Sequence, residues 1–116
     1  MNELQNMSII IGLPLISLKR HIQTLKLSLL RIEELNDESS KIALTPVITN
    51  SLTIANEAYS AVEKRVALMA NHIANQPILM KELMPVFNEP GLCEIEKEAI
   101  EVMRLEIEKI LKSDPH

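Results

Sequence analysis

The apolar residues between Thr45 and Asn75 recur at alternating steps of four and three positions. This spacing places them along one side of a helix, whereas a half-buried strand would alternate apolar and polar residues. We therefore predict a helix over residues 45–75, with Thr45 as its N-cap and Pro46 in its first turn. The stripe consists of Ile48, Leu52, Ala55, Tyr59, Val62, Val66, Met69 and Ile73.

A second apolar line runs beside this stripe on the same predicted helix, and it indicates a second neighbouring helix. Its members are Ile54, Ala58, Ala61 and Leu68.

The first third of the chain has a stripe with the same spacing, which predicts a helix over residues 2–35. Gly12 and Pro14 fall inside it, and proline removes a backbone hydrogen bond from a helix interior. The helix therefore either bends near residues 12–14 or is divided there, with Pro14 opening the main segment. The stripe consists of Leu4, Ile11, Leu15, Leu18, Ile22, Leu25, Leu29 and Ile32.

The rest of the chain predicts a short helix over residues 78–84, a proline-containing loop over 85–91 and a last helix over 92–112. With 116 residues, two glycines and only 2% aromatic residues, the chain does not fit a many-stranded sheet. The predicted fold is a single all-α domain over residues 1–116. It is an antiparallel bundle of three long helices and one short helix with coiled-coil-like seams.

The first predicted helix carries more apolar residues than one stripe accounts for. Large aliphatic residues lie off the stripe near its start and again near its end. A helix that is apolar on opposite faces is usually enclosed on both, and a small bundle covers only one of them. We therefore predict a dimer or partner interface formed by Ile9, Leu13, Ile16, Leu27 and Leu30.

Charge is distributed unevenly along the chain, which has a net charge of −4. No acidic residue occurs between Glu3 and Glu33, while the segment from Glu89 onward holds half of the acidic residues. One interpretation places the basic first helix beside the acidic last helix, with ion pairs at the rim. The other is a surface for an acidic partner, formed by Lys19, Arg20, Gln23, Lys26 and Arg31.

If that partner were DNA, the contacts would be mainly to phosphates and the affinity strongly dependent on salt. The acidic total charge and the absence of a compact helix-turn-helix pattern argue against this alternative.

The sequence contains no pattern that predicts catalysis, a metal site or a cofactor site. His21, His72 and Cys93 share no local ligand spacing, and Gly12 and Gly91 stand alone instead of forming a phosphate-binding loop. Cys93 is either a nucleophile activated at the start of the last helix or a small buried apolar residue. We favour the second interpretation and expect no small-molecule substrate.

The apolar run from Met7 to Leu18 lacks the features of a signal peptide, because Glu3 precedes it and Lys19 and Arg20 follow it. It is also too short to span a bilayer, so we predict a cytoplasmic protein without membrane contact.

Adaptors, secretion chaperones, immunity proteins and inhibitors include many small helical chains of this kind, and the likeness is one of size and class only. We predict a non-catalytic protein–protein interaction module that forms a homodimer. The alternative is a dimeric nucleic-acid-binding regulator that uses the basic first helix.

Overall fold

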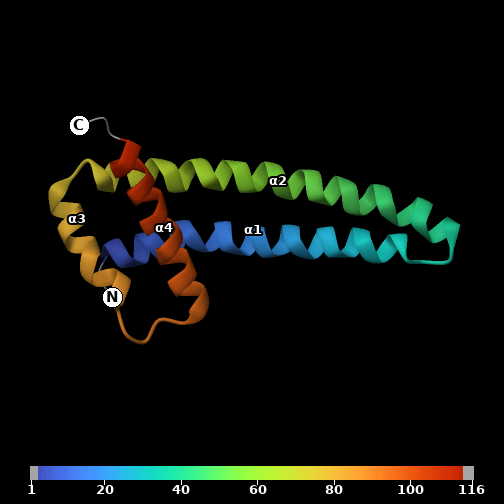
Figure 1. Ribbon diagram of the computed structural model, residues 1–116, viewed down its shortest axis with the longest axis horizontal. Coiled ribbons are helices and arrows are strands. Elements are labelled where there is room, and N and C mark those ends of the chain that lie inside the picture. Colours follow the sequence, from blue (N-terminus) through green and yellow to red (C-terminus); the bar gives the residue numbers. More distant parts are fainter. Residues whose placement is uncertain (1–2, 114–116) are drawn as a thin grey trace. The chain divides into compact units, whose positions relative to one another are not determined.

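The computed structural model describes residues 3–113, except for the side chains of Met84 and Phe87. Within this range the chain is helical and contains no strand, which confirms the all-α prediction. The elements are α1 (Glu3–Glu33), α2 (Glu38–Ala74), α3 (Pro77–Leu83), the 3-10 helix η1 (Met84–Asn88) and α4 (Glu94–Ser113). Figure 1 labels the four α-helices. The predicted helix start at Asn2 lies outside the described residues.

The chain divides into two compact units. The hairpin unit comprises Ser17–Ala61, and the terminal unit comprises Met1–Ile16 together with Val62–His116. Helices α1 and α2 each contribute one segment to each of the two units, whereas α3, η1 and α4 belong to the terminal unit.

In the hairpin unit, the second half of α1 and the first half of α2 lie side by side and antiparallel (Figure 1). Its core consists of the buried residues Ile22, Leu25 and Ala55, against which Ile48, Leu52 and Tyr59 pack in a partly buried state. All six belong to the predicted stripes. The threes-and-fours spacing therefore identified the sides on which the two segments meet.

Helix α2 begins at Glu38, seven residues before the predicted start at Thr45. Asp37 caps it, because its carboxylate accepts hydrogen bonds from the Ser39 backbone N–H at 3.1 Å and from the Ser40 hydroxyl at 2.7 Å. These bonds hold the pKa of Asp37 below its usual value, the Ser40 hydroxyl having the largest effect. Pro46, predicted in the first turn, instead lies inside the helix.

In the terminal unit, α1 and α4 approach each other closely at Gly12 and Ala99. A Cβ atom placed on Gly12 would lie 2.7 Å from the Ala99 carbonyl oxygen and 2.9 Å from the Ala99 Cβ. Only glycine fits such a crossing, so Gly12 serves close helix packing. Helix α1 continues without interruption through Gly12 and Pro14, which excludes the predicted division there.

The core of the terminal unit contains several side chains with no exposed surface at all. The apolar residues that are at most 1% exposed are Val66, Ala70 and Ile73 of α2, Leu83 of α3, Val86 of η1, and Ala99 and Met103 of α4. Residues of every element after the hairpin therefore take part in one tightly enclosed core.

The segment predicted as a loop over residues 85–91 begins instead with η1, in which Pro85 occupies the first turn. Gly91 follows in the left-handed region at φ 88°, which glycine adopts without strain. This turn leads into α4.

Candidate interaction surface

The outer face of α1 in the hairpin unit presents two exposed leucines. Leu27 is 57% exposed and Leu30 is 58% exposed. Successive residues of an α-helix are rotated by about 100° around its axis. Both leucines therefore lie on the side away from the buried Ile22 and Leu25. The spacing predicts this exposure, and the part of the chain described here provides no cover for them.

The polar residues of the predicted basic patch lie exposed on the same segment. Lys19, Arg20, Gln23, Lys26 and Arg31 all belong to this group. We define the outer face of α1 as these five residues with Leu27 and Leu30. Such a surface combines exposed apolar area with positive charge.

The three remaining residues of the predicted interface are placed differently. Ile9 and Ile16 are buried, at 6% and 5% exposure, and Leu13 is half-buried. The expectation that all three face outward is wrong, because α1 is enclosed more broadly in the terminal unit, where α4 packs against Gly12. The structure therefore does not bring them together with Leu27 and Leu30.

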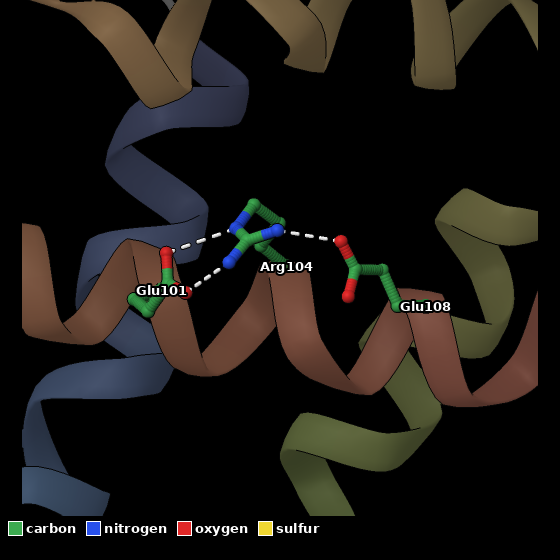
Figure 2. Close-up of polar contacts among 3 residues, drawn as sticks. All are labelled: Glu101, Arg104 and Glu108. Atoms are coloured by element: carbon green, nitrogen blue, oxygen red, sulfur yellow. Dashed lines mark hydrogen bonds and ion pairs between the residues drawn. The ribbon is translucent and has the colours of Figure 1, made fainter.

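The acidic residues of α4 form ion pairs within that helix. Figure 2 shows the Arg104 guanidinium between two carboxylates, donating hydrogen bonds to Glu101 on one side and to Glu108 on the other. The guanidinium lowers the pKa of Glu101, and the hydrogen bond to Glu101 raises that of Arg104.

Two further pairs along α4 are Lys97 with Glu94 at 3.7 Å and Lys109 with Glu106 at 3.2 Å. These local pairs neutralise part of the acidic charge of α4 without the basic residues of α1. The predicted ion pairs between the basic residues of the first helix and the acidic residues of the last stay a prediction.

Cys93 is exposed and stands immediately before α4, so its interpretation as a buried apolar residue is wrong. Its backbone N–H donates a hydrogen bond of 3.1 Å to the Glu96 carboxylate. This is half of a capping box, in which the third residue of a helix satisfies the cap residue. Hydrogen bonds from the Cys93 thiol and then from its backbone N–H lower the pKa of Glu96.

Small hollows occur among the described residues, and the linings of three of them are as follows. One of about 310 Å³ lies between η1 and α4 and is lined by Asn88, Lys97 and Glu101 among others. One of about 270 Å³ is lined in part by Glu3, His72 and Glu82. The third, of about 290 Å³, lies on the hairpin unit and is lined by Leu18, His21, Ser51, Ile54, Ala55 and Ala58.

All three hollows are near the lower size limit of small-molecule sites. Among the described residues, no three His, Cys, Asp or Glu side chains are grouped so that they could hold a metal ion. Within residues 3–113, none of the helices combines the length and the apolar character needed to cross a membrane.

Comparisons with known proteins add no assignment. No family model, curated protein or solved structure matches this chain.

Proposed function

We propose that the chain is a non-catalytic protein–protein interaction module, acting as a homodimer, that binds an acidic protein partner through the outer face of α1. The exposure of Leu27 and Leu30 between basic side chains is the observation that supports this function best. Burying a leucine side chain fully stabilises a complex by about 1.5–3 kcal/mol. The surrounding charges would steer an acidic partner and set its orientation.

The test is affinity purification from the native host with a tagged chain, followed by mass measurement of the complex and its stoichiometry. We expect a partner that is retained by the wild type and lost by the double variant Leu27→Glu, Leu30→Glu. Ile78→Glu is the matched control, because Ile78 is 73% exposed on α3 and belongs to the terminal unit instead of the hairpin unit. A partner retained equally by all three proteins would contradict the proposal.

A second candidate function is nucleic-acid binding, and the cluster of Lys19, Arg20, Lys26 and Arg31 favours it. Binding of this kind would be driven by phosphate contacts and would weaken steeply with salt. It would be lost in the double variant Lys19→Glu, Arg20→Glu but preserved when Leu27 and Leu30 are changed to Ala. Protein binding would be weakened by both pairs of changes, so measuring both pairs distinguishes the two candidates.

A further inference from the structure

Helix α2 carries a second stripe in the hairpin unit, and the large side chains of this stripe are exposed. We define it as Leu44, Val47, Ser51, Ile54, Ala58 and Ala61, which follow one another at steps of three and four. Val47 and Ile54 are each 59% exposed and Leu44 is 43% exposed. The hollow of about 290 Å³ lies along this stripe, between its small residues and Leu18 and His21 of α1.

The segment that carries the stripe is also free of charge. Between Lys41 and Glu57, residues 42–56 include no acidic or basic side chain, although most of them are exposed. A solvated helix face normally carries charged residues. An exposed, periodic and uncharged face of this length is typical of a surface that is buried in an assembly.

We propose that a second copy of the chain covers the second stripe, with the two α2 helices antiparallel about a two-fold axis near residues 52 and 53. A two-fold interface places the same surface on both copies, so the stripe must be complementary to itself. In this register Leu44 meets Ala61 of the other copy, Val47 meets Ala58, and Ile54 meets Ser51. Each large side chain therefore lies opposite a small one, as close helix packing requires.

Charge supports the same register. The next position of the stripe after Ala61 is Arg65, which this arrangement brings opposite Ser40 of the second copy. The neighbouring Asp37 carboxylate is hydrogen-bonded to that Ser40 hydroxyl and is exposed. Arg65 of one copy would therefore approach Asp37 of the other at both ends of an otherwise uncharged contact. Exposed ion pairs of this kind add little affinity, but they favour one register of the two helices over others.

The outer face of α1 is a poorer surface for a second copy. Lys19, Arg20, Lys26 and Arg31 would meet their own counterparts across a two-fold axis, and like charges at close range oppose association. The inference deepens the proposed function by assigning self-association to α2, and it leaves the outer face of α1 to the acidic partner.

The first experiment measures the mass of the full chain in solution by light scattering after size-exclusion chromatography. We expect twice the 13.1 kDa of one chain for the wild type. Ile54→Glu should raise the dimer dissociation constant by about 100-fold or more, because the two-fold axis places two buried carboxylates in the contact. Asn56→Glu is the control, because Asn56 is exposed on the other side of α2 and should leave the dimer intact.

The second experiment tests register by cross-linking in a Cys93→Ser background, since Cys93 is the only native thiol. Chains that carry Val47→Cys are mixed with chains that carry Ala58→Cys and are then oxidised mildly. We expect the mixed disulfide dimer, because the two positions face each other. Val47→Cys alone should cross-link poorly, because its two copies would be separated by about 16 Å along the helix axis.

Several outcomes would overturn the inference. They are a wild-type monomer at the highest concentration reached, a dimer unaffected by Ile54→Glu, or efficient cross-linking of Val47→Cys with itself. Circular dichroism must show that Ile54→Glu keeps the helical content, which we expect from its exposed position. Loss of partner capture by the Leu27 and Leu30 variant with an intact dimer would support the two assignments separately, so either one can fail without the other.

Discussion

The terminal unit and the hairpin unit bury their apolar residues to different extents. In the terminal unit, Ala70, Ile73, Leu83, Ala99 and Met103 have no exposed surface. In the hairpin unit, the buried apolar residues Ile22, Leu25, Ile32 and Ala55 each remain 5–8% exposed. Two packed helices hide one side of each other, whereas α4 and α3 add further layers to the terminal core. The terminal unit therefore contains the helices that cover its core, whereas the hairpin unit consists of two helix segments only.

The largest expected effect on the free energy of unfolding comes from truncating one buried side chain in the core of each unit. Ile73→Ala should reduce the free energy of unfolding by about 2–5 kcal/mol, towards the upper part of that range because its surroundings are fully enclosed. Leu25→Ala should cost less, about 2 kcal/mol, because a two-helix layer can close partly around the lost side chain. Urea unfolding followed by circular dichroism measures both. Equal losses would show that the hairpin core is as tightly enclosed in solution as the terminal core.

The next largest effect concerns the crossing of α1 and α4. Gly12→Ala should destabilise the protein by about 1–3 kcal/mol, because the new methyl group would overlap the Ala99 carbonyl oxygen. In an exposed helix the same change stabilises by about 1 kcal/mol, so the sign of the effect tests the close approach. Ser17→Ala, at an exposed position of the same helix, should change stability by less than about 0.5 kcal/mol.

The smallest effect concerns the cap at the start of α2. The pKa of Asp37 is lowered in the folded protein, so the charged cap stabilises fully above the usual aspartate pKa of about 3.9. That contribution is lost as the pH falls through the lowered folded value. Asp37→Ala should therefore lower the melting temperature slightly at neutral pH, and the difference from wild type should shrink in acid.

Asp37→Asn is the matched control for this prediction. Asparagine can still cap the helix but does not titrate, so the variant should show no acid-dependent loss at this site. Thermal melts of the three proteins at neutral and acidic pH provide the comparison. A wild-type advantage over Asp37→Ala that persists unchanged in acid would contradict the charged cap.

Periodicity was sufficient to predict the two longest helices and the sides on which the hairpin segments meet, because each stripe is a local property of the sequence. The start of α2 was harder to predict, because Asp37 and Thr45 are both good N-cap residues followed by helix-compatible segments. The earlier cap is used in the structure. Ile32, near the end of α1, is buried in the structure.

The exposure of Leu27 and Leu30 was predictable, but the burial of Ile9 and Ile16 was not. Both pairs lie off the stripe in the same way, but Ile9 and Ile16 belong to the terminal unit, where α4 approaches α1 at Gly12 and Ala99. That contact joins residues far apart in the chain, so helical spacing contains no information about it. In the sequence, Gly12 and Ala99 are small residues far apart, and no pattern marks them as the point where two helices cross.

The uncharged segment of α2 also has a consequence for the unfolded chain. Residues 47–54 contain five β-branched residues and no glycine, proline or charged side chain. Short windows of this composition readily form intermolecular strands once they leave their helix. Contacts that keep this segment helical, including contacts with a second copy, would therefore also protect the chain from aggregation.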